Sequence, residues 1–458
     1  MEGFLEGKLC GFCMPVPTIK DKAALGTHQL FAGIADMSVK FLKEKIFSRR
    51  GKSEKPKNAY IVIEDFMKLP VYFYHTIGLN PYELKGTNNK PGIGFYILFL
   101  LHMINANIVL ALEIFFVYVS FRNNENFIES CMVMSYIGFV IVGELKIGAV
   151  LLQKQKLTNL VRQMESVFPP ARQKEQEEYD VRRYLRRCLR YTKGFGGLYM
   201  TLVITYNLFA ICQYSIQKWI LHSPHAKQTV PYVPLTPWTW QDNWKFYPTY
   251  LSQSMAGYTA TCGHISADLM IFAVAIQVIM HFDRLAKSLT EFSVRAKSEE
   301  DGADKDLKQL QELIAYHNKI LGLTDVMNEV FGLALLLNFL ASSTLVCFVG
   351  FQISIGISPE MMAKLILILI SANSEIYLIC NFSQMLIDAS GSICYAVYDM
   401  NWSEADPRFR KMLILLALRA QKPVCLTATV FLDISIETMS IFLRMSYKFF
   451  CAIRTMYQ

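Results

Sequence analysis

The sequence predicts an all-α membrane protein with seven transmembrane helices, a cytoplasmic N-terminus, an extracellular C-terminus and a cytoplasmic helical anchor layer. Three observations lead to this fold class: an apolar composition, a series of long runs with few charges, and basic residues concentrated in alternate connections. The 458 residues are 53% hydrophobic and 18% charged, with a mean hydropathy of +0.26. Soluble domains contain about 45–50% apolar and about 25% charged residues, so the composition favours a membrane protein.

Six segments are apolar over at least the roughly 20 residues that a helix needs to cross the hydrocarbon core of a bilayer. They are 92–121, 127–152, 194–216, 255–280, 330–357 and 361–387. A seventh candidate lies within 427–453, where Asp433, Glu437, Arg444 and Lys448 interrupt the apolar pattern. We therefore expect seven crossings, of which the last is the least apolar.

Lysine and arginine are concentrated in every second connection between these segments. The connection 153–193 holds eleven of them and 282–328 holds seven, whereas 218–253 holds three. Basic connections face the cytoplasm, which places the N-terminus inside and, after seven crossings, the C-terminus outside. Both basic connections also carry apolar residues at helical spacing, so we expect the helices at 194–216 and 255–280 to continue into a cytoplasmic layer.

Several other function classes are disfavoured by the same patterns. A G-protein-coupled receptor has the opposite orientation, and we interpret the Asp283-Arg284 pair after the fourth span as a charged helix end. No GxSxG, HExxH or Walker-type loop is present, so we expect no enzyme, catalytic residue or cofactor. Cys10 and Cys13 form a CxxC pair without a second pair of ligands, so no metal site is expected. The net charge of +8 is modest and predicts no nucleic-acid partner.

Pro423 divides the C-terminal region into two parts. The segment 408–422 is basic at both ends and too short to cross a membrane, so it is expected to be a cytoplasmic helix. The segment 431–456 is long enough, and at 100° per residue Glu437, Arg444 and Lys448 fall on one polar stripe. Charged groups in lipid are costly, so this stripe either contacts helices of the same subunit or lines a water-filled path.

The tail from 398 to 456, "YDMNWSEADPRFRKMLILLALRAQKPVCLTATVFLDISIETMSIFLRMSYKFFCAIRTM", resembles the C-terminal signature of insect odorant receptors. The signature has an upstream Tyr and Trp, a break of the form Arg-x-Gln-Lys-Pro, an Ala and a Phe after it, and a Ser-Tyr pair near the end. The matching residues are Tyr398, Trp402, Arg419, Gln421, Lys422, Pro423, Ala428, Phe431, Ser446 and Tyr447. The number of spans, the inverted orientation and "GLNPYEL" before the first span also fit the family.

The resemblance implies a ligand-tuned subunit that assembles with a shared coreceptor into a tetramer around one pore. The tetramer would be a non-selective cation channel opened by small volatile molecules, in the plasma membrane of olfactory sensory neuron dendrites. The segment 408–422 would belong to the anchor that holds the subunits together, and 434–456 would line the pore. By resemblance the gate lies near Tyr447, Phe450, Cys451 and Arg454. Because Arg444 and Lys448 would repel cations in the lumen, we expect them to turn toward lateral cavities, to pair with Glu437 or acidic groups on other helices, or to be outweighed by coreceptor subunits.

With these roles, five parts of the chain are expected. They are a cytoplasmic N-terminal segment (1–64), a membrane-associated region before the first helix (65–91), six transmembrane helices with cytoplasmic extensions (92–398), the anchor helix (399–423), and the pore-lining helix with the C-terminus (424–458).

The resemblance also implies a ligand pocket in the outer half of the helix bundle. Apolar and aromatic walls with a few hydroxyls suit small volatile molecules, which bind by burial and shape. The candidates in that half are Met132, Tyr136, Phe139, Tyr206, Phe209, Gln213, Met255, Tyr258, Cys262, Leu367 and Ile370. Ordinary helix packing is the alternative role for each of them.

Charged residues inside the spans are functional candidates, since they are costly in lipid. They are Glu113, Glu144, Lys146, Asp268, Lys364 and Glu375. Glu144 and Lys146 lie close to the cytoplasmic end of their span, and we expect their side chains to reach the membrane surface. Asp268 and Glu375 lie deeper and are candidates for hydrogen bonds between helices.

A gustatory-type chemoreceptor channel and a secondary transporter remain the alternative functions.

Overall fold

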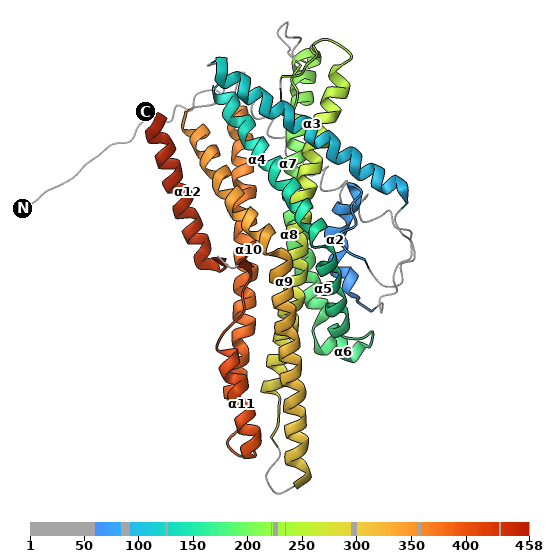
Figure 1. The fold of residues 1–458 in the computed structure, drawn as a ribbon, viewed down its shortest axis with the longest axis vertical. Coiled ribbons are helices and arrows are strands. Elements are labelled where there is room, and N and C mark those ends of the chain that lie inside the picture. The colour runs from blue at the N-terminus through green and yellow to red at the C-terminus, as the bar shows by residue number, and fades with distance from the viewer. Residues whose placement is uncertain are drawn as a thin grey trace, which may run out of the picture. The chain divides into compact units, whose positions relative to one another are not determined.

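Long helices carry most of the chain that the structure describes (Figure 1). The structure is a computed structural model that describes residues 60–83, 92–123, 127–220, 222, 228–233, 235–294, 300–355, 359–429 and 432–457. All of these belong to one unit, Tyr60–Gln458. Most of the expected N-terminal segment 1–64, including Cys10 and Cys13, lies outside the described residues, as does Phe431 of the C-terminal signature.

The elements follow each other in a simple order. The helices are α2 (Ile63–Thr76), α3 (Ile93–Asn123), α4 (Phe127–Leu152), α5 (Lys154–Val167), α6 (Gln173–Glu178), α7 (Val181–Ser215), the π-helix η2 (Ile216–Ile220), α8 (Phe246–Thr290), α9 (Glu300–Ile355), α10 (Pro359–Asp399), α11 (Pro407–Ala420) and α12 (Ile436–Tyr457). Between the last two helices, β1 (Thr427–Ala428) pairs antiparallel with β2 (Leu432–Asp433), with Thr427 opposite Asp433 and Ala428 opposite Leu432.

The six segments expected from hydropathy are confirmed as long apolar helices. In the described chain, α3, α4, α7, α8, α9 and α10 are each long and apolar enough to cross a membrane. The expected extensions of α7 and α8 are also confirmed, since α7 begins at Val181 and α8 ends at Thr290. With 56 residues, α9 is about 84 Å long at 1.5 Å per residue, far more than the roughly 30 Å of a bilayer core.

Helix α8 is the central helix of the bundle. It contacts α2, α3, α4, α7, α9 and α10. Every residue from 259 to 282 is buried, which explains why this segment is largely apolar on all sides and shows no amphipathic stripe. Because α8 is enclosed by other helices, the polar groups that it carries must find their partners inside the protein.

Helix α4 approaches the central helix through glycine. A Cβ at Gly263 of α8 would lie 2.4 Å from the carbonyl oxygen of Gly143, and a Cβ at Gly143 would lie 2.6 Å from the carbonyl oxygen of Ala260. Small residues of this kind allow membrane helices to pack backbone against backbone. The α4–α8 crossing therefore depends on two glycines that face each other.

The segment before the first long helix folds onto the bundle as α2, which contacts α7 and α8. The Tyr258 hydroxyl of α8 donates to Oγ1 of Thr76 at 2.8 Å, and the same Oγ1 lies 3.8 Å from Sγ of Cys262. Gly78 then turns the chain with φ +77°, and a Cβ there would lie 2.5 Å from the carbonyl oxygen of Phe95. This turn needs glycine for its conformation and for the close approach of α3.

The Asp283-Arg284 pair joins α8 to the preceding helices. The Tyr184 hydroxyl of α7 donates to Asp283, and Arg284 forms an ion pair with Glu178 of α6 at 2.9 Å. Asp283 and Arg284 thus join the end of α8 to α7 and α6 of the same chain, which is the structural role expected of a charged helix end.

The hairpin after α11 is held by two polar side chains of the long helices. Oγ of Ser383 accepts a hydrogen bond from the Leu426 amide at 2.9 Å and donates to the Ile434 carbonyl at 2.6 Å. Asn328 of α9 donates to the Cys425 carbonyl at 2.9 Å and accepts from the Thr427 amide at 3.2 Å. The expected break at Pro423 therefore leads into a short hairpin, which fixes where α12 begins.

Candidate ligand cavity and the exposed C-terminal helix

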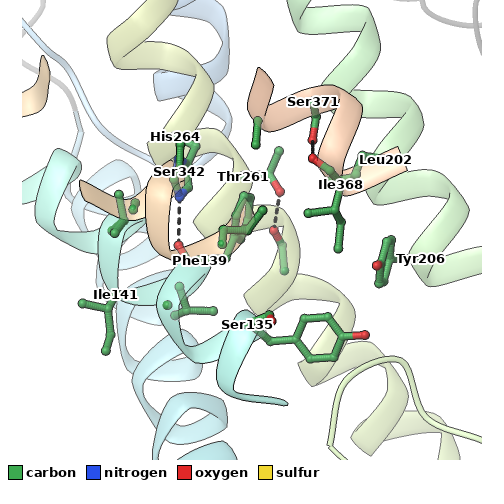
Figure 2. Close-up of a pocket in the computed structure, with 18 of the residues that line it drawn as sticks. Ser135, Phe139, Ile141, Leu202, Tyr206, Thr261, His264, Ser342, Ile368 and Ser371 are labelled. Atoms are coloured by element: carbon green, nitrogen blue, oxygen red, sulfur yellow. Dashed lines mark hydrogen bonds between the residues drawn. The ribbon is translucent and has the colours of Figure 1, made fainter. Parts of the chain in front are cut away.

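A cavity of about 320 Å³ lies among the long helices (Figure 2). Its walls come from α3, α4, α7, α8, α9 and α10, together with Tyr232 of the segment between α7 and α8. The apolar and aromatic members of the wall include Val109, Met134, Tyr136, Phe139, Val140, Ile141, Leu202, Val203, Tyr206, Tyr232, Leu340, Leu345, Phe348 and Ile368. A wall of this composition suits a small apolar molecule.

Three hydroxyl groups on the wall are satisfied by their own helices. Thr261 donates to the carbonyl of Gly257 at 2.8 Å, Ser371 to that of Ile368 at 2.8 Å, and Thr344 to that of Leu340 at 2.9 Å. Two of these bonds are drawn in Figure 2. Because the three hydroxyls already donate, they do not require a polar ligand.

Three tyrosine rings form one end of the cavity. The ring centroid of Tyr136 lies 5.9 Å from that of Tyr206 and 5.5 Å from that of Tyr232. Gln253 of α8 holds the Tyr232 segment, since its Oε1 accepts from the Tyr232 and Val233 amides and its Nε2 donates to the Val233 carbonyl. A Cβ at Gly257 would lie 2.2 Å from the Tyr232 hydroxyl, so only glycine leaves room for this ring.

A buried charge cluster adjoins the cavity. Nζ of Lys146 lies 2.9 Å from Asp268 and 3.1 Å from Glu375, and all three side chains are almost fully buried. Asn338 donates to the second oxygen of Asp268 at 2.7 Å, and the Tyr199 hydroxyl donates to the second oxygen of Glu375. Four long helices, α4, α8, α9 and α10, are thus joined through a single lysine and its partners, with α7 attached through Tyr199.

His264 connects this cluster to the cavity wall. Its ring stacks on Phe139 with centroids 4.2 Å apart, and its Nε2 lies 2.9 Å from the Phe139 carbonyl oxygen (Figure 2). Its Nδ1 lies 3.3 Å from Nζ of Lys146. Because His264, Tyr199 and Glu375 all line the cavity, the cluster forms part of the cavity wall.

The expectation that Lys146 reaches the membrane surface is wrong. Its side chain is 0% exposed and points into the bundle, where it meets two carboxylates. A lysine at this depth is stable only with such partners, which could not be recognised from its position near the end of α4. The expected role of Asp268 and Glu375 in contacts between helices is confirmed, with Lys146 as their shared partner.

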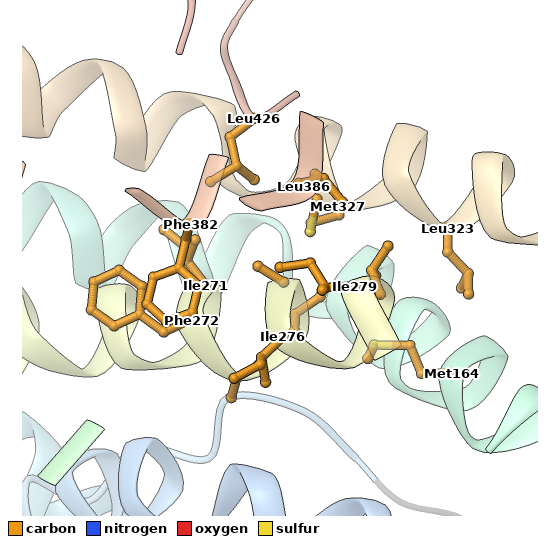
Figure 3. Close-up of a cluster of buried hydrophobic side chains, with 14 of the residues drawn as sticks. Met164, Ile271, Phe272, Ile276, Ile279, Leu323, Met327, Phe382, Leu386 and Leu426 are labelled. Carbon is orange, nitrogen blue, oxygen red and sulfur yellow. The ribbon is translucent and has the colours of Figure 1, made fainter. Parts of the chain in front are cut away.

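An apolar core lies along α8 beyond the charge cluster (Figure 3). Phe272 of α8 stacks on Phe382 of α10 with ring centroids 4.7 Å apart. Leu386 of α10, Met327 of α9 and Leu426 of the hairpin region belong to the same buried cluster. The cavity wall and the hairpin before α12 are therefore connected through one tightly packed core.

The structure brings three of the eleven expected ligand-binding residues to this cavity: Tyr136, Phe139 and Tyr206. Tyr258 and Cys262 contact α2 instead, and Ile370 is 50% exposed on the outside of the bundle. The remaining five, which do not line the cavity, are Met132, Phe209, Gln213, Met255 and Leu367. Binding by any of the eleven stays a prediction.

Sequence reasoning missed the contributions of α3, α9 and the Tyr232 segment to the wall. Glu113 of α3 carried a signal, because it is a carboxyl group inside a span. The α9 residues and Tyr232 carried none, since they look like ordinary apolar positions. Among the described residues, no group of three or more His, Cys, Asp or Glu side chains is placed to hold a metal ion.

Helix α12 packs along one narrow stripe. Thr438, Phe442 and Ser446, spaced four residues apart, are buried against the neighbouring helices α9 and α10. Phe450 continues this stripe, since a Cβ at Gly350 of α9 would lie 3.2 Å from its ring. In Figure 1 the helix stands at the margin of the bundle.

The polar stripe of α12 faces away from its own subunit. Glu437, Arg444 and Lys448 are exposed, and none forms an ion pair or hydrogen bond with another described side chain. The interpretation that helices of the same subunit satisfy the stripe is therefore wrong for the described chain, and so is pairing of Arg444 or Lys448 with Glu437. Of the expected gate residues, Tyr447 is 67% exposed, Arg454 is exposed and Cys451 is half-buried.

The remaining signature residues lie around α11. Tyr398 is 77% exposed and Trp402 is 41% exposed. Arg419 at the end of α11 donates to the Lys422 carbonyl at 2.9 Å, which closes the turn before Pro423. Asp406 caps the start of α11 by accepting from the Arg408 amide at 3.0 Å. Exposed apolar residues on α11, Ile414, Leu415 and Leu418, leave a face free for contact with another protein surface.

Comparison with known proteins places this arrangement in a family. A family model described as 7tm Odorant receptor matches residues 126–447. Odorant receptor 67a of Drosophila melanogaster is 53% identical over 406 residues, which cover 89% of this chain and 99% of the relative. Odorant receptor 85c of the same species is 39% identical, covering 86% of this chain and 99% of the relative.

The fold is also that of a solved receptor. The structure of the insect olfactory receptor OR5 from Machilis hrabei in complex with eugenol matches with a TM-score of 0.69 and 14% identity, covering 86% of this chain and 97% of that one. The structure of the same receptor described without a ligand matches with a TM-score of 0.70 and 15% identity, covering 85% and 98%.

The fold and the cavity define a mostly helical, multi-pass membrane protein of the receptor class. The chain belongs to the insect odorant receptor family. Its function is therefore that of an olfactory receptor, and the gustatory-type channel and the secondary transporter are set aside.

Proposed function

We propose that this chain is the ligand-tuned subunit of an odorant-gated, non-selective cation channel, assembled as a tetramer with the shared coreceptor. Small volatile molecules bind in the cavity among α3, α4, α7, α8, α9 and α10, and binding opens a pore lined by α12. The cytoplasmic N-terminus, the extracellular C-terminus, and a location in the plasma membrane of olfactory dendrites belong to the same proposal.

The exposed polar stripe of α12 is the observation that carries the channel assignment. Charged side chains in a membrane face protein or water, and Glu437, Arg444 and Lys448 are exposed and face no protein within the described part of their own subunit. Assembly around a central pore gives the stripe an aqueous surface and neighbouring subunits to meet. A separate monomer leaves it against lipid, which is costly.

The gate is assigned to the later part of α12. Tyr447 and Phe450 have ring centroids 6.2 Å apart, and Phe450 contacts α9 while Tyr447 projects outward. A ring of such side chains from several subunits makes a hydrophobic constriction that closes by excluding water. A small movement of α12 against α9 widens this constriction. Cys451 and Arg454 lie on the next turn of α12.

Coupling from the cavity to α12 follows the packed core. Glu375 and Phe382 lie on α10, and the hairpin before α12 is held by Ser383 of that helix and by Asn328 of α9. A ligand that shifts α10 by a fraction of an ångström therefore acts on the start of α12 through the hairpin. The exposed apolar face of α11 serves as the anchor between subunits.

Whole-cell current provides the test. Cells carrying this chain together with an insect coreceptor are exposed to a panel of volatile molecules while G-protein signalling is blocked. We expect a ligand-evoked cation current that cells with the coreceptor alone do not give. Loss of the current under the block contradicts the channel assignment, and an N-terminal tag accessible from outside contradicts the orientation.

A further inference from the structure

Glu113 is a carboxyl group that faces the cavity from α3. The buried residues of α3 recur three or four positions apart and form a single stripe on a helix whose other described side chains are exposed or half-buried: His102, Ala106, Val109, Glu113, Phe116 and Ser120. Val109 packs with Ala256 of α8, and Phe116 packs with Val133 and Val233. Glu113 lies between these two apolar contacts and is 1% exposed. Its place on the stripe directs it into the bundle and not into lipid.

This carboxyl group has no hydrogen-bond or ion-pair partner in the described chain. Its buried Oε2 accepts no hydrogen bond, and no ion pair to Glu113 is found among the described residues. The other carboxyl group on the cavity wall, Glu375, is bonded by both Lys146 and Tyr199. A buried carboxyl oxygen without a partner is costly, so its presence on the wall of a cavity points to a bond that a ligand completes.

The rest of the wall limits how many polar groups that ligand can carry. Three of the hydroxyls on the wall, those of Thr261, Thr344 and Ser371, donate to their own helices, and His264 is bonded on both ring nitrogens. The buried Tyr206 hydroxyl, like Oε2 of Glu113, has no hydrogen-bond partner in the described chain. The wall is otherwise mainly apolar. The cavity therefore matches a molecule with an apolar body and one polar end.

We propose that the cavity selects small, mainly apolar molecules that carry one hydroxyl group, and that this hydroxyl donates a hydrogen bond to Glu113. A carboxyl oxygen accepts such a bond whether or not the group carries a charge. An ether or hydrocarbon of the same shape leaves Oε2 buried and unbonded, and this lack of a partner is what discriminates against it. This inference rests on the proposed function, since it names the ligand class of the proposed site.

The test compares isomers that differ in whether their oxygen carries a hydrogen. The pairs are phenethyl alcohol with benzyl methyl ether, and hexanol with methyl pentyl ether. In cells with the coreceptor we expect the alcohols to have half-maximal concentrations about tenfold lower than their ether isomers. In Glu113→Leu this ratio should fall to about one, while Glu113→Gln, whose amide oxygen still accepts, should keep most of it.

Glu144→Leu is the matched control. Glu144 is also a carboxyl group in a membrane helix, but it accepts from Asn107 at 3.1 Å and does not line the cavity. The alcohol preference should survive this change. An alcohol preference that is absent in the wild type, or that is unchanged in Glu113→Leu, overturns the inference while leaving the odorant-gated channel intact.

A binding measurement separates this inference from the channel proposal. Thermal unfolding of the purified chain is followed with each alcohol and each ether, because a ligand that binds the folded state raises its melting temperature. A shift with the alcohols that is lost in Glu113→Leu supports the inference even if no current flows. Absence of a shift with any alcohol overturns it.

Discussion

Replacing Lys146 with methionine should prevent most of the chain from reaching the cell surface in a folded state. The change removes the only cation bonded to Asp268 and Glu375 in the described chain and leaves two carboxylates buried in the middle of the bundle. Breaking a buried ion pair in this way costs about 3–5 kcal/mol. Since proteins are stable by only about 5–15 kcal/mol, the loss is a large part of the total. Surface biotinylation measures the amount of receptor at the cell surface, and thermal unfolding measures the loss of stability.

Two further variants make this prediction specific. Lys154→Met breaks an ion pair with Glu83 at 2.8 Å whose side chains are 31% and 67% exposed, so it should cost less than about 1 kcal/mol. Adding Asp268→Asn and Glu375→Gln to Lys146→Met removes the uncompensated charges and should restore part of the surface expression. Wild-type stability of Lys146→Met alone would show that the cluster does not hold the helices together.

Gly263→Ala is expected to have a comparably large effect on folding. The added methyl group would lie 2.4 Å from the Gly143 carbonyl oxygen, and backbone on both sides of the contact cannot move independently. Overpacking of this kind costs about 1–3 kcal/mol or more. Moving α4 away from α8 would also separate Lys146 from Asp268, which adds to the loss. We expect low surface expression and a lower melting temperature.

Gly148→Ala provides the comparison for that variant. Gly148 lies on α4 five residues after Gly143, and a Cβ there meets nothing within 4 Å. Alanine in a helix is favoured over glycine by about 0.5–1 kcal/mol, so this change should leave the receptor as stable as before or slightly more so. If Gly263→Ala and Gly148→Ala behaved alike, the close approach of α4 and α8 would not matter for folding.

The transmembrane helices could be predicted well because the bilayer imposes a length and a composition. The ends of α3 and α4 agree with the expected segments to within two residues. The extent of α9 was harder to predict, because its part outside the apolar run is amphipathic and continues the same helix without a break. The break between α6 and α7 falls at Asp180, whose φ of 49° no helix-spacing pattern reveals.

The candidate site could be predicted only in part, because a hydropathy pattern shows which residues are in the membrane but not which way they point. Tyr136, Phe139 and Tyr206 face the cavity, whereas Tyr258 on α8 faces α2. The rotation of each helix is decided by contacts such as Gly143 with Gly263 and Lys146 with Asp268. These contacts join residues more than a hundred positions apart, and a single sequence does not display them.

In the proposed function, the odorant acts in the cavity among the long helices. Ala372 of α10 lines this cavity, and Ala363 lies on the same helix but is exposed and does not line it. The decisive measurement is the concentration dependence of ligand-evoked current in Ala372→Phe and Ala363→Phe channels that reach the surface in equal amounts. We expect Ala372→Phe to raise the half-maximal concentration by about tenfold or more, because the ring occupies ligand space, and Ala363→Phe to behave as the wild type. A wild-type response from Ala372→Phe would contradict binding in this cavity, since the odorant would then act elsewhere.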